Sequence, residues 1–236
     1  KESLMPILEN INFSISMNSV LRSQGADPKI IRERKPILLD YAKNAKEIGQ
    51  PLLEPKILFQ EFAIEKVGHE RITLSNGKYL KGQLISQHLS GAEKVLVILL
   101  TVGDKIENKI NEIIFSDPVL GMALEAVGSA STEALANETC NYFDKEALNN
   151  NLETTIPLSP GMVGWSLENG QAEIFDLLDA SEIGVELTTS SLMFPRKTLS
   201  LVIGVGKDLE NHGDMCSYCA MNKNCQYKEH YSEKVS

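Results

Sequence analysis

The chain has 236 residues, of which 42% are hydrophobic, and its 23 basic and 32 acidic residues give a formal net charge of −9. This length predicts one large or two small globular domains with a core of ordinary size. The acidic balance and the absence of a basic stripe exclude nucleic acid as an expected partner. The longest apolar run, residues 95–100, is too short to span a bilayer, and no secretory signal is recognisable. We therefore expect a cytoplasmic protein without a membrane partner.

The first part of the chain predicts a mixture of strands and helices. Apolar and polar residues alternate over residues 11–18, which predicts a half-buried strand. Asp27 followed by Pro28 is a typical helix start, and we expect this helix to run to about residue 48. The other predicted elements are a strand over residues 56–66, a hairpin over residues 71–83 that turns at Asn76-Gly77, and a strand over residues 93–100 with two apolar faces, which indicates a central position.

The second part predicts helices and strands in alternation. Residues 101–104 form a predicted turn between a strand and a helix, and a long helix is expected over residues 117–148. One face of that helix is built from small residues, which allow close approach of either another protein segment or a ligand: Gly121, Gly128, Ala130 and Ala134. The remaining predictions are an amphipathic helix over residues 171–178 and strands over residues 184–188 and 199–206.

Two loops in this second part are candidates for ligand binding. The first contains two glycines, a proline and the only tryptophan of the chain, so it permits close backbone approach and offers a flat ring. The second, residues 190–200, carries two adjacent cations. Ordinary structural loops are the alternative. The predicted binding residues are Ser159, Pro160, Gly161, Gly164, Trp165, Arg196 and Lys197.

Three of the four cysteines lie close together near the end of the chain, as Cys216, Cys219 and Cys225, with the spacing C-x2-C-x5-C. Thiolates spaced in this way can bind one metal ion or one iron–sulfur cluster. In a reducing compartment such a group indicates metal or redox chemistry more often than disulfides. A disulfide with a spare thiol is the alternative. We predict that these three cysteines are metal ligands.

The identity of the metal and its fourth ligand stay open. The spacing differs from the C-x2-C-x2-C of bacterial ferredoxins, and it is only half of a zinc ribbon, which has two C-x2-C pairs. The candidate cofactors are an iron–sulfur cluster, most simply a [4Fe–4S] cluster, or zinc. The fourth ligand could be Cys140, His212, His230 or a group from outside the protein, and for Cys140 the alternative is a buried inert thiol.

The order of motifs in the second part resembles a known family. The motifs are Ser159-Pro-Gly161, Ile174-Phe-Asp-Leu-Leu178, Ile183-Gly-Val-Glu-Leu-Thr188 and Met193-Phe-Pro195. Together they resemble the activation domain of cobalamin-dependent methionine synthase, and in particular its stand-alone relatives beside corrinoid methyltransferases. The resemblance covers residues 90–206. It implies an α+β fold with a curved, mainly antiparallel sheet and flanking helices, and a part in the reductive remethylation of cob(II)alamin with S-adenosylmethionine (AdoMet).

The chain departs from this family at the expected AdoMet site. Pro157 stands where the family commonly has an arginine, which suits a bidentate contact with the AdoMet carboxylate. Met162 replaces a usual tyrosine, and residues 201–204 replace an aromatic stretch. Arg196 or Lys197 is a candidate for the missing cation. We therefore expect AdoMet binding only if another positive charge replaces the arginine.

These observations lead to a functional hypothesis in which the chain has three parts. Residues 1–90 would form an N-terminal α+β portion, residues 91–206 the activation-domain-like core, and residues 207–236 a metal-binding tail, within one compact domain or several. The protein would serve a corrinoid protein or cobalamin-dependent methyltransferase, passing an electron to cob(II)alamin through an iron–sulfur cluster. The alternatives are a non-catalytic corrinoid-protein or AdoMet-binding module with structural zinc, and an AdoMet-dependent methyltransferase for a small substrate. The oligomeric state, including a homo-oligomer, stays open.

Overall fold

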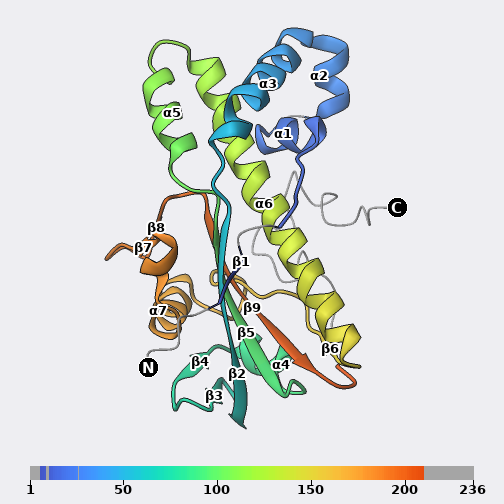
Figure 1. The fold of residues 1–236 in the computed structure, drawn as a ribbon, viewed down its shortest axis with the longest axis vertical. Helices are drawn as coiled ribbons and strands as arrows, with labels where there is room; N and C mark the ends of the chain where they lie inside the picture. The colour runs from blue at the N-terminus through green and yellow to red at the C-terminus, as the bar shows by residue number, and fades with distance from the viewer. Residues whose placement is uncertain (1–5, 9–10, 26, 210–236) are drawn as a thin grey trace.

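The computed structural model describes residues 6–8, 11–25 and 27–209, and the statements below concern this part of the chain. It forms a seven-stranded antiparallel sheet with helices on both faces and a helical group at one end (Figure 1). The strand order is β4-β3-β2-β5-β9-β6, and β1 pairs with β2 beside this path. The strands of this sheet are β1 (Ile7–Leu8), β2 (Lys56–Val67), β3 (Arg71–Leu74), β4 (Tyr79–Lys81), β5 (Lys94–Thr101), β6 (Glu153–Thr154) and β9 (Thr198–Gly206).

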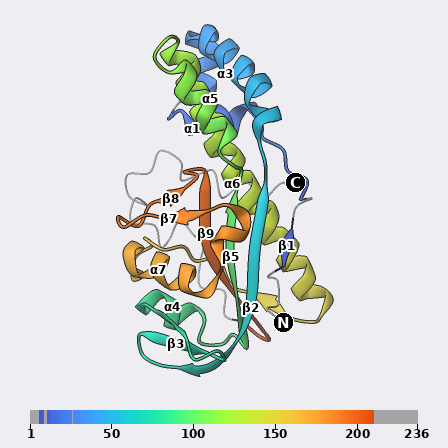
Figure 2. The same cartoon turned by 60° about the vertical axis from the view of Figure 1, so that its left-hand side comes forward.

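The helices lie on either side of this sheet. Figure 2 shows α4, α7 and the small hairpin of β7 and β8 on one face, with α6 on the other. Helices α1, α2, α3 and α5 gather around the first half of α6. The bounds are α1 (Met17–Ser23), α2 (Pro28–Arg34), α3 (Pro36–Gly49), η1 (Gln50–Leu52), α4 (Gln83–His88), α5 (Lys105–Ile113), α6 (Pro118–Asn149), α7 (Leu167–Leu177), η2 (Ala180–Ile183), β7 (Glu186–Leu187) and β8 (Met193–Phe194).

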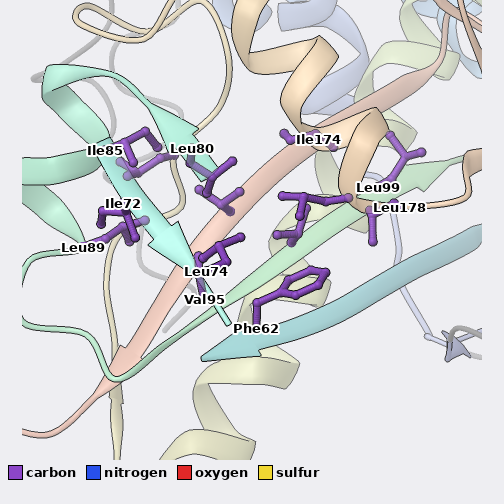
Figure 3. Close-up of a cluster of buried hydrophobic side chains, with 14 of the residues drawn as sticks. Phe62, Ile72, Leu74, Leu80, Ile85, Leu89, Val95, Leu99, Ile174 and Leu178 are labelled. Carbon is purple, nitrogen blue, oxygen red and sulfur yellow. The ribbon is translucent and has the colours of Figure 1, made fainter. Parts of the chain in front are cut away.

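Strand β5 lies in the middle of the sheet, as its continuous apolar run predicts. It pairs with β2 from Lys94 to Thr101 and with β9 over the same length. Its side chains alternate between two cores: Val95, Val97 and Leu99 face α7, whereas Leu96, Ile98 and Leu100 face α6. Figure 3 shows the first of these cores, where β2, β3, β4, β5, α4 and α7 all contribute apolar side chains.

Helix α6 joins the two ends of the molecule. Its 32 residues span about 48 Å. The first half packs Leu124 and Val127 against α1, α3 and α5, and the second half packs Leu135 and Phe143 on the sheet. No helix in the described ranges is long and apolar enough to cross a membrane.

Three local predictions were wrong. Residues 11–16 do not pair in a sheet; they form an extended segment that ends at Ser16, the N-cap of α1, whose Oγ accepts from the Ser19 backbone N–H at 3.0 Å. Alternating burial continues along this segment, so the pattern indicated extended backbone correctly but not strand pairing. The helix expected to run to about residue 48 breaks at Lys35, because Pro36 excludes helical backbone at the residue before it. The second strand of the hairpin, expected to end at residue 83, ends at Lys81, and Gln83 begins α4.

The predicted α+β fold with a mainly antiparallel sheet and flanking helices is confirmed by this architecture. The predicted turn at Asn76-Gly77 is also confirmed, with Gly77 at φ +80° between β3 and β4. The boundary at residue 90 stays a prediction, although β2 from before it and β5 from after it pair along their length.

The close packing of Gly121 on α6 gives a first prediction. A Cβ at Gly121 would lie 2.5 Å from Ile114 Cδ1 and 3.0 Å from Ile114 Cα, so in Gly121→Ala the Ile114 side chain must move and its backbone must shift slightly. We expect a lower free energy of unfolding, because overpacking of about 1–3 kcal/mol outweighs the gain of about 1 kcal/mol in helix propensity. Urea unfolding measures the difference. The control is Met122→Ala at a 64% exposed neighbour, and equal stability of both variants would contradict this packing.

Candidate functional site

The loop of residues 159–165 is held in shape by its own backbone. The Gly161 N–H donates to the Trp165 carbonyl, and the Trp165 N–H donates to the Met162 carbonyl, both at 2.9 Å. Gly161 and Gly164 have φ angles of +95° and +93°, which residues with a side chain rarely adopt. The loop therefore requires glycine at both positions.

Trp165 lies in the core beneath this loop, with 1% of its surface exposed. Its ring contacts two further glycines: a Cβ at Gly170 would lie 2.8 Å from Nε1, and a Cβ at Gly82 would lie 3.1 Å from Cδ1. The indole Nε1 donates to Glu173 Oε2 at 3.4 Å. Protein atoms thus cover most of the ring, and a ligand contact of Trp165 stays a prediction.

The loop and a distant segment enclose an open hollow of about 650 Å³. The distant segment is the junction of β4 and α4, where the Leu84 N–H donates to the Gly164 carbonyl at 3.3 Å. A Cβ at Gly82 would lie only 2.7 Å from that carbonyl oxygen, so the two backbones meet closely. The lining residues are Glu70, Lys81, Gly82, Gln83, Gly161, Met162, Gly164, Trp165, Ser166, Leu167 and Asn169. The structure therefore brings Gly161, Gly164 and Trp165 together at one surface.

The sequence analysis missed the β4–α4 wall of this hollow. It placed residues 78–83 in one strand and gave Lys81 and Gly82 no role. Nothing in the local pattern links Gly82 to Gly164, since the contact joins segments far apart in the chain. The available signal was a glycine directly after a short strand, which can mark close approach of another backbone.

Glu173 of α7 ties the two walls together. Its Oε2 accepts from the Lys81 backbone N–H at 3.0 Å as well as from Trp165. Burial raises the pKa of Glu173, while the hydrogen bonds from Lys81 and Trp165 and the charge of Lys81 oppose this shift. The carboxyl group is thus a positioning group behind the hollow.

Arg196 and Lys197 lie elsewhere and do not line the hollow. The Lys197 side chain crosses Gly128 of α6, where a Cβ would lie 2.9 Å from Lys197 Cε. Its Nζ donates to Glu125 and, at 3.0 Å, to Ser129 Oγ. Arg196 is exposed. A ligand role for these two cations stays a prediction, and Lys197 would have to leave its partners on α6 to fulfil it.

The predicted metal ligands Cys216, Cys219 and Cys225 lie outside the described residues, as do His212 and His230. Cys140 lies on α6 beside the core, where burial raises the pKa of its thiol to about 12. Within residues 6–209, apart from the gaps given above, no three or more His, Cys, Asp or Glu side chains are grouped to hold a metal ion. The metal site and its fourth ligand stay predictions.

Comparisons with known proteins connect this geometry to a solved structure. No known family matches the sequence, and no curated protein matches it. A solved structure described as the MetH reactivation domain bound to AdoHcy superposes with a TM-score of 0.61 at 14% sequence identity. The match covers 89% of this chain and 81% of that one. The protein has the fold of the MetH reactivation domain. This confirms the predicted activation-domain-like fold.

The contact between Gly82 and Gly164 gives a second prediction. Gly82→Ala should destabilise the protein by about 1–3 kcal/mol, because the new methyl group overlaps the Gly164 carbonyl. The emission of Trp165, the only tryptophan, should shift to longer wavelength as the loop moves and water enters. Urea unfolding and fluorescence measure both effects. Gly91→Ala is the matched control, since its nearest neighbour would be 3.6 Å away; a Gly82→Ala variant that behaves like it would contradict the close contact.

The burial of Glu173 gives a third prediction, on pH dependence. Because its pKa is raised in the folded state, the folded protein holds this proton more tightly than the unfolded chain. The stability of the parent protein relative to Glu173→Gln should therefore be greatest in acid, below the ordinary value of 4.5, and should fall as the pH rises through the raised pKa. Urea unfolding from pH 4 upward tests this. Glu186→Gln, which removes an exposed carboxylate, is the control.

Proposed function

We propose that this protein is an accessory of cobalamin-dependent methyl transfer that reductively reactivates cob(II)alamin on a partner corrinoid protein. The observation that carries the proposal is the fold, which is shared with a MetH reactivation domain solved with AdoHcy, together with a hollow at the Ser159-Pro-Gly161 loop. In this chemistry cob(II)alamin takes up one electron, and the resulting cob(I)alamin takes the methyl group of AdoMet and releases AdoHcy. The role assigned to the protein is to bind the methyl donor, dock the partner and deliver the electron.

Exposed apolar side chains support docking through the two predicted loops. Val163 and Leu167 beside the hollow are 60% and 45% exposed. Leu192 and Phe194, on the β7–β8 hairpin, are 55% and 47% exposed. Large apolar side chains gathered on loops are typical of surfaces that a partner covers. We assign the partner contact to residues 159–165 and 190–197.

The position of Leu209, the last described residue, supports delivery of the electron to the end of the molecule that carries the hollow. The Leu209 N–H donates to Glu153 Oε2 at 3.0 Å, and Leu209 lies near Gly91, just after α4. The start of α4 lines the hollow, and this six-residue helix is only about 9 Å long. Cys216 follows Leu209 by seven residues, a reach of up to about 25 Å. Chain length thus permits the cysteines to approach a corrinoid bound over the hollow.

The fourth prediction tests the electron path. Protein purified without oxygen should contain iron, absorb visible light and give an EPR signal after reduction, and it should speed the reduction of cob(II)alamin on a corrinoid protein by a chemical reductant. A variant with Cys216, Cys219 and Cys225 all changed to Ser should lose the iron and this rate enhancement.

Cys140→Ser is the companion variant. Retention of iron would exclude Cys140 as the fourth ligand, and loss of iron with an intact fold would identify it. A colourless protein that holds stoichiometric zinc would contradict electron transfer. It would favour a binding module with a structural zinc site, for which the C-x2-C pair is also suited.

A further inference from the structure

The β7–β8 hairpin and the residues after it expose three side chains of the kind that dominate protein interfaces. Leu192 and Phe194 are 55% and 47% exposed, and Arg196 is exposed two residues later. Only four residue steps separate the first from the last, which places their Cα atoms at most about 14 Å apart. Aromatic residues and arginine are enriched at the centres of interfaces. These three residues therefore form one compact surface, called the hairpin patch below.

The fold holds the hairpin patch at both of its ends. At the start, the Leu192 N–H donates to Thr188 Oγ1 at 3.0 Å, and the Thr188 N–H donates to the Leu192 carbonyl at 2.8 Å. At the end, the Lys197 N–H donates to Glu107 Oε1 of α5 at 3.0 Å, and the Lys197 ammonium is bound by Glu125 of α6. The chain on either side of the patch is thus fixed before a partner arrives, which lowers the conformational entropy lost on binding.

Arg196 is the unpaired charge of this loop. Its neighbour Lys197 is 7% exposed and is neutralised by Glu125, whereas Arg196 forms no ion pair within the described part of the chain. Glu186 lies directly across the hairpin from Phe194, so its exposed carboxylate shares the outer face. A guanidinium group beside apolar side chains is suited to a carboxylate, which it can bind through two parallel hydrogen bonds.

We propose that the hairpin patch is the centre of the partner contact, where Arg196 binds a carboxylate of the corrinoid protein and apolar side chains of that protein cover Leu192 and Phe194. This inference rests on the proposed function and deepens it, because it names the chemistry of the partner's surface. At long range the net charge of −9 repels a carboxylate. The affinity therefore depends on the local contact with Arg196 and on the apolar area beside it.

The test is a calorimetric titration, without oxygen, of the full chain with the cob(II)alamin-loaded corrinoid protein of the fourth prediction. Arg196→Gln should raise the Kd about tenfold, the size of one hydrogen bond to a charged group, and Phe194→Ser should raise it at least as much. Glu186→Gln should not raise the Kd, because it removes a negative charge beside the incoming carboxylate. Arg34→Gln, which removes an exposed arginine of α2, is the matched control and should leave the Kd unchanged.

Three results would overturn this inference alone. If Arg196→Gln and Phe194→Ser leave the Kd unchanged, another surface makes the contact. If Glu186→Gln raises the Kd, the partner brings a positive charge instead. If Arg196→Gln equally weakens binding of free cob(II)alamin, which carries a phosphate but no carboxylate, the cation recognises the corrinoid and not the protein around it.

Failure of the proposed function gives different results. A complex that shows the expected sensitivity to Arg196→Gln, but in which cob(II)alamin is reduced no faster, would overturn the electron path and leave the hairpin patch assigned. A parent protein that binds no corrinoid protein would overturn the docking role and the hairpin patch with it.

Discussion

The hollow depends on one close contact between two backbones, at Gly82 and Gly164. No side chain fits between them, because a Cβ at Gly82 would lie 2.7 Å from the Gly164 carbonyl oxygen. This contact lets the Leu84 N–H reach the loop, and it places the Trp165 ring under both walls. Glu173 then bonds to each wall through a single oxygen. If the contact is lost, the two walls no longer share a buried tryptophan, and the surface that joins them opens.

Much of the fold was predictable because local patterns there agree with the tertiary structure. The apolar run of β5 has only one stable environment, a position covered on both faces, and the structure gives it α7 on one side and α6 on the other. The Asn76-Gly77 turn is set by backbone conformation alone. Prediction failed where a neighbouring residue or a contact with a distant segment determines the local structure. Pro36 breaks a helix whose periodicity continues through it, and the segment before Ser16 is extended without a partner strand.

The candidate site was half predictable for the same reason. Two glycines and a proline in residues 159–165 indicate an unusual backbone, and the structure confirms positive φ angles at Gly161 and Gly164. The opposite wall has no such local signature, because Lys81 becomes a lining residue only through the packing of α4 on the loop. At Gly128 the sequence shows the small residue but not the side chain that packs against it. Its small size is visible in the sequence, but the group that it accommodates, the Lys197 side chain, is visible only in the structure.

The charge of the chain bears on which ligand the hollow can hold. With a net charge of −9, the protein repels anions at long range, and salt screens this repulsion beyond about 8–10 Å. AdoMet, the methyl donor of the proposed function, carries a net positive charge on its sulfonium, because the two charges of its amino-acid group cancel. The acidic balance of the chain therefore favours its approach to the hollow over that of an anionic ligand.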